Sequence, residues 1–562
     1  MRRHFKHTPN HDIAPDEIFL DDRNIPEFDV QQFEGRIEAP IERRTIVFLG
    51  AFFVLIGLVF LGRAGVLQLK EGKAYTAKSE ENRLEHQLLF PDRGIIYDRR
   101  GVELAWNTAS PEELGFSLRA YIEAPGFAHV LGFLHYPARD KYGVYYRKDY
   151  EANAGVEEYY NDRLKGKTGL RIIETDALGN VMSSNVIDPP LSGNVLRLTI
   201  DARVQEKFSE LIGRVAREED YLGGAGAIMD IESGELLALV SYPEYDPNVM
   251  TAGDDADAIA KWNSDERTPF LNRAVAGLYT PGSIVKPMFA IGALNEEILT
   301  PETPIESRGY IAIPNPYVPD EETRFNDWKA HGWLDMRTAI AQSSNVYFYE
   351  VAGGYKNQKG LGIARVEKYA RLFGYGRATG IDLYGEQSGT VPNPEWKALN
   401  FPDDPTWRIG DTYFTGIGQY GMQTTLMQAL REAATIASKG AVVTPHLAQD
   451  VATSISQLSI PESYFMVTQE GMRKSATLGT ASLLNIPGIK IAAKTGTAEL
   501  GVAKTRVNSW VIGFFPYDKP KYAFAVVMDK GVRGNTTNAS YVAQQLFWFM
   551  LAETPEYLEI SE

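Results

Sequence analysis

The sequence contains no cysteine and no long run of lysine and arginine. The absence of cysteine excludes disulfides and cysteine-ligated metals. The net charge of −16 gives no indication of the basic surface that nucleic-acid binders carry. Hydrophobic residues make up 44% of the chain and charged residues 23%, as in ordinary folded proteins. The length of 562 residues predicts two or three domains.

One long apolar run lies near the N-terminus. Ile46 to Gly62 reads IVFLGAFFVLIGLVFLG, and after Arg63 apolar residues continue to Leu69. A bilayer needs about 20 such residues. A buried core helix is the alternative, whereas a cleaved signal peptide is disfavoured, since the tail from Met1 to Arg44 is too long and no A-x-A site follows. We predict an uncleaved membrane anchor at residues 45–69.

The rest of the chain is predicted to form two domains behind a flexible cytoplasmic tail at residues 1–44. Residues 70–220 are mixed, with short alternating strands such as Asn194–Ile200. Residues 221–562 read as a compact enzyme domain. Its predicted elements are a hairpin of Ala225–Ile231 and Glu235–Tyr242, a hairpin of Ser509–Pro516 and Tyr522–Asp529, and a closing helix at Ala539–Ala552. Apolar helical runs between the hairpins predict an α/β (α+β) fold, an antiparallel sheet covered by helices.

A serine and a lysine in this domain have the spacing of a nucleophile and its base. Tyr279 to Leu294 reads YTPGSIVKPMFAIGAL, which predicts a helix that starts at Ser283 and places Lys286 on the same face. A serine hydroxyl needs an adjacent base, and a neutral lysine can serve if burial and nearby positive charge lower its pKa. The helix N-terminus offers N–H groups to an oxyanion. A surface serine and lysine at a helix start would give the same pattern.

Two later motifs strengthen the catalytic interpretation. The first is S-x-N at Ser343, Ser344 and Asn345, and the second is K-T-G-T at residues 494–497. Alternating apolar residues before Lys494 predict a strand, and a glycine within it would let a substrate backbone approach closely. S-x-x-K, S-x-N and K-T-G-T in this order are the pattern of serine β-lactamases and penicillin-binding proteins.

The chain also contains imperfect copies of both later motifs. Residues 183–185 repeat S-S-N, and residues 167–169 repeat K-T-G. Both precede S-x-x-K, and Leu170 stands where the second threonine of K-T-G-T would be. We interpret both copies as structural coincidences.

From the membrane anchor onward the sequence resembles the class B penicillin-binding proteins. The blocks that carry the resemblance are Arg83–Asn107 with Arg93, Gly94 and Asp98, then Gly155–Gly169, Asn272–Pro287, Thr415–Leu430 and Asn508–Pro516. Within class B, Phe325–Glu350 and Thr379–Lys397 look more like the elongation-type penicillin-binding protein 2 than the septal enzyme.

The resemblance implies a transpeptidase domain at 221–562 on an elongated, non-catalytic pedestal of the dimerisation type at 70–220. It implies that Ser283 attacks the D-Ala-D-Ala carbonyl of a peptidoglycan stem peptide, that D-Ala leaves, and that a neighbouring stem-peptide amine resolves the acyl-enzyme. The other motif residues have implied roles as well. Lys286 is the base, Ser343 and Asn345 relay protons and hold the peptide amide, and Lys494 supports the relay electrostatically. Thr495 and Thr497 bind the substrate carboxylate, Gly496 is a further substrate-binding residue, and the N–H groups of Ser283 and Thr497 form the oxyanion hole.

The resemblance also implies partners and a location. The partners are β-lactam antibiotics, a polytopic glycosyltransferase of the shape, elongation, division and sporulation family, and other elongation-complex proteins. The location is the plasma (inner) membrane, crossed once, with the catalytic domain on the periplasmic or extracytoplasmic side. Some relatives carry a metal site near residues 325–350 that includes a cysteine. Because this chain has none, we expect no metal there, and no cofactor.

Four alternatives are weighed against this interpretation. A β-lactamase would carry E-x-x-L-N, but Glu395 stands one residue too far from Leu399 and Asn400; carboxypeptidase side activity stays compatible with the motifs. A glycosyltransferase is disfavoured, since roughly 150 residues before the enzyme domain are few for one. A non-catalytic β-lactam sensor or scaffold is disfavoured by the intact motifs. A septal transpeptidase would share them all.

Overall fold

The computed structural model describes residues 42–81, 84–111, 114–176, 180–315, 318 and 321–558. The chain divides into two compact units. The first comprises the described residues up to Glu85 together with Ile173–Ser183, and the second comprises the remaining residues from His86 onward. The predicted flexible tail, residues 1–44, lies outside the described residues except for its last three.

The predicted membrane anchor is a single apolar helix. Helix α1 spans Arg43–Gly65 and continues as a π-helical turn, η3, over Val66–Lys70. These 28 residues have a mean hydropathy of 2.7 over their most apolar window, and together they are long and apolar enough to cross a membrane. The helix begins two residues before the predicted boundary. It is followed by α2, at Gly72–Glu81.

The first sequence block that carries the family resemblance contains three pedestal residues with structural roles: Arg93, Gly94 and Asp98. Arg93 and Arg119 both form ion pairs with Glu157, at 2.6 and 2.8 Å, and all three side chains are buried. Burial alone would raise the pKa of Glu157, but the two guanidinium groups outweigh it and hold that pKa below its ordinary value. A Cβ at Gly94 would lie 2.0 Å from the carbonyl oxygen of Asn194.

The pedestal strands are short. One sheet has the order β11 (Leu196–Arg197), β2 (Ile96–Tyr97), β3 (Glu103–Thr108) and β4 (Leu118–Tyr121), and another has the order β1 (Leu84–Leu89), β9 (Gly169–Thr175) and β10 (Val181–Asp188). We predicted a strand over Asn194–Ile200, but within that range only the two residues of β11 form a strand. Asp98 accepts hydrogen bonds from the N–H groups of Arg100, Val102 and Ala202, and so ties the pedestal to the start of α6 (Ala202–Glu218). Because α6 packs on the sheet of the catalytic domain, the predicted boundary at residue 220 falls after that domain's first helix.

The catalytic domain is built on a five-stranded antiparallel sheet, as predicted. Its order is β13 (Leu236–Tyr242), β12 (Gly223–Asp230), β22 (Tyr522–Val532), β21 (Arg506–Phe515) and β20 (Ala492–Leu500). Both predicted hairpins form, and they join because β12 pairs with β22, with Ala227 opposite Ala525. Strand β20 occupies one edge. It carries the K-T-G-T motif within it, whereas the sequence predicted the strand before the motif.

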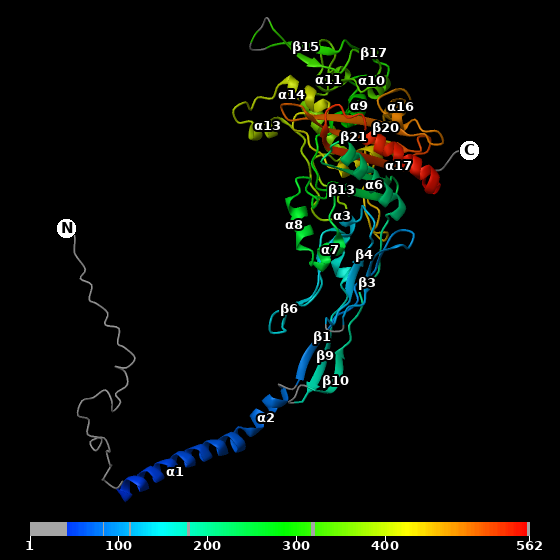
Figure 1. Ribbon diagram of the computed structural model, residues 1–562. Coiled ribbons are helices and arrows are strands. Elements are labelled where there is room, and N and C mark those ends of the chain that lie inside the picture. The colour runs from blue at the N-terminus through cyan, green and yellow to red at the C-terminus, as the bar shows by residue number, and fades with distance from the viewer. Residues whose placement is uncertain are drawn as a thin grey trace, which may run out of the picture. The chain divides into compact units, whose positions relative to one another are not determined.

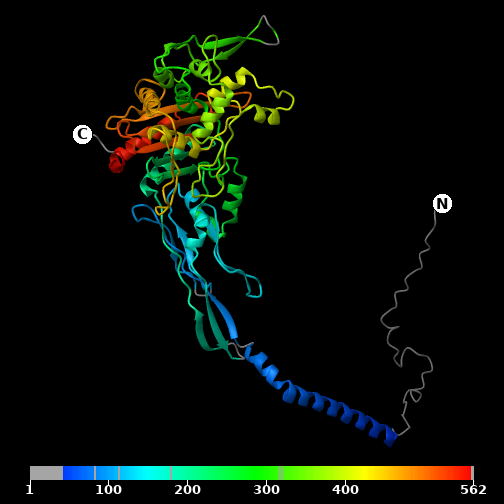
Figure 2. The same cartoon turned by 180° about the vertical axis from the view of Figure 1, so that it is seen from behind.

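Helices cover both faces of this sheet. Ile228, Val511 and Val526 pack with α6 (Ala202–Glu218) and α17 (Ala539–Glu553), which Figures 1 and 2 show beside each other although they lie at opposite ends of the domain's sequence. Alternate strand residues, such as Ala227 and Ile512, pack in the other core cluster with α9 (Lys286–Asn295) and α15 (Leu426–Ala437). The predicted closing helix is thus confirmed as α17.

Further elements complete the second unit. Its helices include α3 (Ala128–Leu131), α4 (Gly155–Tyr159), α5 (Asn161–Leu164), α7 (Pro247–Ala252), α8 (Ala256–Ser264), α12 (Gly362–Leu372), α13 (Pro394–Asn400), α14 (Ile409–Gly416) and α16 (Glu462–Leu478). Its shorter strands include β5 (Phe133–His135), β8 (Glu151–Asn153), β14 (Ile305–Ser307), β15 (Tyr310–Pro314), β16 (Glu322–Asn326) and β17 (Gly332–Leu334).

Candidate active site

The predicted nucleophile lies on a tight turn at the start of a buried helix. Ser283 belongs to a 3₁₀ turn, η4 (Gly282–Val285), which leads directly into α9. The sequence predicted a helix from Ser283, and the 3₁₀ geometry keeps Ser283 and Lys286 on one side, because residues i and i+3 eclipse in it. Ser283 is partly exposed, whereas Lys286 is completely buried.

The S-x-N residues form a strained turn between two helices. Helix α10 (Met336–Gln342) ends at Ser343, whose backbone is left-handed with φ 55° and ψ 37°. Ser344 then caps α11 (Asn345–Gly353) by accepting a hydrogen bond from the N–H of Tyr347. A left-handed serine costs on the order of 1 kcal/mol or more, so the surrounding contacts must hold this turn.

This turn supplies the partners of Lys286. The ammonium of Lys286 donates to the carbonyl oxygen of Ser343 and to Oδ1 of Asn345, both at 2.8 Å, and Oγ of Ser343 lies 3.5 Å from the same nitrogen. From the other side, Lys494 on β20 donates to the same Oγ at 2.8 Å. The hydroxyl of Ser343 therefore lies between two buried lysines. The fold brings together the three motifs that the sequence placed in order.

Burial changes the protonation of both lysines. It lowers the pKa of Lys286 to about 7, against a smaller opposing effect of the Asp327 carboxylate. Burial also holds the pKa of Lys494 well below its ordinary value, and the charge of Lys286 lowers it further. Near neutral pH a large fraction of Lys286 is thus the free amine that a base must be.

The remaining K-T-G-T residues lie at the open side of β20. Thr497 is exposed, and the hydroxyl of Thr495 donates to that of Thr480 at 2.7 Å. A Cβ at Gly496 would lie 2.9 Å from Cγ2 of Ile284 and from the carbonyl oxygen of Pro281. The close approach that we expected a substrate to make at Gly496 is therefore made by the segment that carries Ser283.

Two buried carboxylates near the lysines were not predicted from the sequence. Glu432 on α15 is completely buried and accepts from the hydroxyl of Tyr375, and burial raises its pKa to about 8. A glutamate within an otherwise largely apolar helix was the available signal. Asp327, in the loop between β16 and β17, had no comparable local signal, because its partners come from β14 and α11.

The imperfect motif copies at residues 167–169 and 183–185 make contacts away from the three motifs. Lys167 forms an ion pair with Asp188 at 2.9 Å, and Ser183 donates to Glu174 at 3.1 Å, both between exposed side chains. These contacts agree with our interpretation of the copies as coincidences. Over the described parts of the chain, no group of three or more His, Cys, Asp and Glu side chains is arranged to hold a metal ion.

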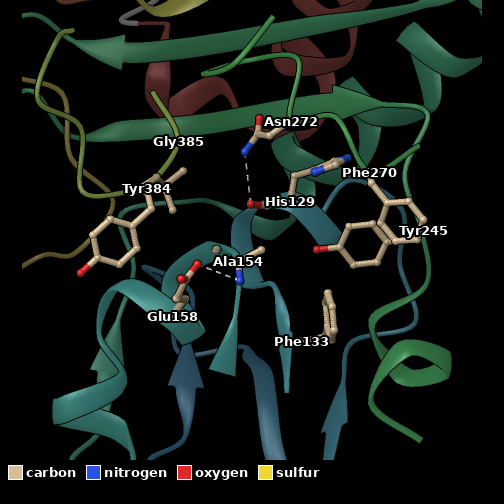
Figure 3. A pocket seen from close by; sticks show the side chains of 11 residues that line it. His129, Phe133, Ala154, Glu158, Tyr245, Phe270, Asn272, Tyr384 and Gly385 are labelled. Carbon is tan, nitrogen blue, oxygen red and sulfur yellow. Dashed lines mark hydrogen bonds between the residues drawn. The ribbon is translucent and has the colours of Figure 1, made fainter. Parts of the chain in front are cut away.

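A separate cavity of about 240 Å³ lies where β5, α4 and the catalytic domain meet. Figure 3 shows Tyr245 and Phe270 on one side of it and Tyr384 on the other, and the first two rings stack at 5.3 Å. Glu158 accepts there from the N–H of Ala154. None of the predicted catalytic residues lines this cavity.

Comparisons with known proteins match most of the chain. The family profile described as penicillin binding protein transpeptidase domain matches residues 224–548, and the profile described as penicillin-binding protein dimerisation domain matches residues 116–198. The peptidoglycan D,D-transpeptidase MrdA of Salmonella typhimurium is 28% identical over 612 aligned positions, which cover 88% of this chain and 94% of that protein.

Two solved structures are similar in fold. A complex between the penicillin-binding protein PBP2 and MreC from Helicobacter pylori contains a chain that is 26% identical, with a TM-score of 0.70, covering 84% of this chain and 99% of that one. A structure described as the coordination of polymerization and crosslinking by a peptidoglycan synthase complex contains a chain that is 26% identical, with a TM-score of 0.69, covering 90% of this chain and 98% of that one.

Proposed function

Since the chain belongs to the penicillin-binding protein transpeptidase family, we propose that Ser283 is its nucleophile and is acylated by peptidoglycan stem peptides and by β-lactams. The protein is a class B peptidoglycan D,D-transpeptidase of the PBP2/MrdA, elongation type. The observation that supports the assignment of Ser283 is its position at the start of α9, one 3₁₀ turn before a buried lysine whose pKa is about 7.

Acylation begins with proton transfer from Ser283 to the neutral amine of Lys286. Oγ of Ser283 attacks the carbonyl carbon of the D-Ala-D-Ala bond, and the developing oxyanion accepts from the N–H groups of Ser283 and Thr497. The carbon–nitrogen bond breaks as the leaving D-Ala amine takes a proton from the hydroxyl of Ser343. Lys286, protonated in the first step and within reach of that hydroxyl, restores its proton, while Lys494 donates a hydrogen bond to the same oxygen.

Cross-linking reverses the proton path. The amine of a second stem peptide attacks the ester carbonyl, and its proton passes through Ser343 and Lys286 to Oγ of Ser283, which leaves. Water in place of the amine would give a carboxypeptidase product. Glu395, the nearest match to the glutamate of β-lactamases, is exposed on α13, which supports a synthase over an efficient hydrolase.

The donor peptide is proposed to bind along β20. An edge strand leaves backbone groups unpaired on one side, and an extended peptide can add to it as a further strand. Thr495, whose hydroxyl donates to Thr480, and the exposed Thr497 lie on this strand and would bind the terminal carboxylate, while Asn345 would hold a peptide amide.

The location and partners are proposals of the same kind. The apolar helix at Arg43–Lys70 would anchor the protein once in the plasma membrane, with the pedestal and the transpeptidase domain outside the cytoplasm. The similar chains seen with MreC and in a peptidoglycan synthase complex support binding to elongation-complex proteins and to a polytopic glycosyltransferase.

The nucleophile is tested by labelling with fluorescent penicillin. Ser283→Ala is expected to abolish covalent label, and Ser183→Ala, in the S-S-N copy on β10, serves as the control that keeps it. Label on folded Ser283→Ala would refute the assignment. Mass spectrometry of stem-peptide products, with and without an acceptor amine, then separates cross-linking from hydrolysis.

A further inference from the structure

The carboxylate of Asp327 is a buried acceptor of converging hydrogen bonds. Its side chain is 0% exposed. Oδ2 accepts from the hydroxyl of Ser344 at 2.7 Å, from the N–H of Val346 at 3.0 Å and from the hydroxyl of Ser307 at 3.2 Å. Oδ1 accepts from the N–H of Trp328 at 2.9 Å. Asp327 thus joins its own loop, β14 and the start of α11.

These bonds fix the part of the site that contacts Lys286. Ser344 donates to Asp327 and accepts from the N–H of Tyr347, so the carboxylate holds the cap of α11 in place. The next residue, Asn345, accepts from the ammonium of Lys286. A carboxylate at a helix N-terminus also interacts favourably with the helix dipole. Because Ser343 is strained, the turn depends on such external contacts.

Asp327 also contributes charge to the site. Burial alone would raise its pKa, but the N–H groups of Val346 and Asn345, the hydroxyl of Ser344 and the charge of Lys286 lower it, so the carboxylate is ionised. Among the described residues, the Asp327 carboxylate is the negative charge that raises the pKa of Lys286. The same negative charge favours the ammonium form of Lys286 and opposes the effect of burial.

Other charged groups face this pair from each packed element. Lys494 approaches from β20, with Glu432 of α15 beside it. His331, from the loop of Asp327 itself, has Nε2 at 3.7 Å from Oδ1, and burial lowers the pKa of this imidazole. Lys329 acts on His331 from the exposed part of the loop. None of these groups supplies an anion in direct contact with the S-x-N turn.

We propose that Asp327 is a positioning residue of the transpeptidase, which holds the Ser343–Asn345 turn against Lys286 and, through its negative charge, sets the pH range over which Lys286 acts as the base. The inference rests on the proposed roles of Ser283 and Lys286. It adds a residue outside all three motifs to the machinery of acylation.

The test is the pH dependence of acylation in Asp327→Asn. The rate constant for labelling by fluorescent penicillin is measured from pH 5 to 9 on the full chain in detergent, and the folded fraction is measured by thermal melting. Asn keeps an acceptor oxygen but removes the charge. We expect the midpoint of the acid limb to move about one pH unit lower, and the plateau rate to fall about tenfold or more as the turn loosens.

Asp335→Asn is the matched control. Asp335 caps the neighbouring helix α10 by accepting from the N–H of Thr338 at 2.7 Å, and no contact joins it to Lys286. This variant is expected to lose stability and to keep the parent's acid limb. A folded Asp327→Asn protein with the parent's acid limb would overturn the inference.

A second variant covers the case in which Asp327→Asn does not fold. Asp327→Glu keeps the charge but displaces the carboxylate, so the acid limb is expected to stay within about 0.3 pH unit of the parent's while the plateau falls about tenfold. A parent-like plateau would contradict the positioning role. Failure of the proposed function is distinguished from these outcomes, because it appears as label on Ser283→Ala in the parent background.

Discussion

Nζ of Lys494 donates a 2.8 Å hydrogen bond to Oγ of Ser343, a residue 151 positions earlier in the chain. On the other side of that hydroxyl is Lys286, at 3.5 Å. The contact joins the K-T-G-T strand to the S-x-N turn and places a proton-bearing hydroxyl between two amines. The chemistry of the site depends on how burial and charge set the protonation of this arrangement.

Lys286→Arg should remove most of the acylation activity. Arginine keeps the positive charge but does not lose its proton in proteins, so it cannot accept one from Ser283. Loss of a general base costs roughly 10²–10⁴-fold in rate. The measurement is the time course of fluorescent penicillin labelling, with Lys474→Arg on α16 as a control that should behave like the parent. A parent-like rate in Lys286→Arg would exclude Lys286 as the base.

Acylation of the parent should show an acid limb with its midpoint near pH 7. Because burial lowers the pKa of Lys286 to about 7, the neutral fraction falls about tenfold for each pH unit below that value and saturates above it. Rate constants for labelling between pH 5 and 9 give the midpoint. A midpoint near the ordinary lysine value would show that Lys286 is not desolvated in the working enzyme.

Ser343→Gly should be more stable than Ser343→Ala, and both variants should be less active than the parent. Glycine tolerates the left-handed backbone of this position, so relief of strain should stabilise the fold by roughly 0.5–1 kcal/mol relative to Ser343→Ala. Both variants lose the hydroxyl between Lys286 and Lys494, so both should acylate slowly. Chemical denaturation and penicillin labelling measure the two effects, and equal stability of the two variants would argue against strain at this turn.

Glu432→Gln should stabilise the protein at pH 8 and have little effect at pH 5. Burial raises the folded-state pKa of Glu432 to about 8, whereas an unfolded glutamate ionises near 4.5. The unfolded state therefore holds fewer protons between these values, and stability falls as pH rises through them. Gln keeps an acceptor for Tyr375 and removes the ionisation, so the gain at pH 8 should be at least about 1 kcal/mol. Thermal melting at both pH values is the measurement, and an equal gain at pH 5 and 8 would contradict it.

Gly496→Ala should impair acylation by moving the nucleophile. The added Cβ would lie 2.9 Å from Cγ2 of Ile284 and from the carbonyl oxygen of Pro281, so the turn that carries Ser283 must shift. A displacement of this kind near reacting atoms can cost about 10²-fold in rate. Gly72→Ala, in α2, is the control, since its Cβ would make only an ordinary 3.6 Å contact with the carbonyl oxygen of Leu67. A parent-like labelling rate in Gly496→Ala would mean that the turn accommodates the methyl group.

Much of the fold could be predicted because it depends on local patterns. The two hairpins, the closing helix and the long apolar helix near the N-terminus each follow from side-chain periodicity or run length, and the structure has all four. The predictions that failed concerned boundaries. The strand expected over Asn194–Ile200 is two residues long, and β20 runs through the K-T-G-T motif, because pairing with β21 decides where a strand begins and ends.

The sequence by itself determined the order of the three motifs and of the blocks around them, which together carry the family resemblance and led us to propose Ser283 as the nucleophile. The tertiary structure decided the rest. Only it shows that Lys286 is desolvated, that Ser343 adopts a left-handed backbone, that Gly496 makes room for the segment of Ser283, and that Asp327 contacts the S-x-N turn. Each of these depends on contacts between segments remote in sequence, and burial and hydrogen-bond geometry are set by such contacts.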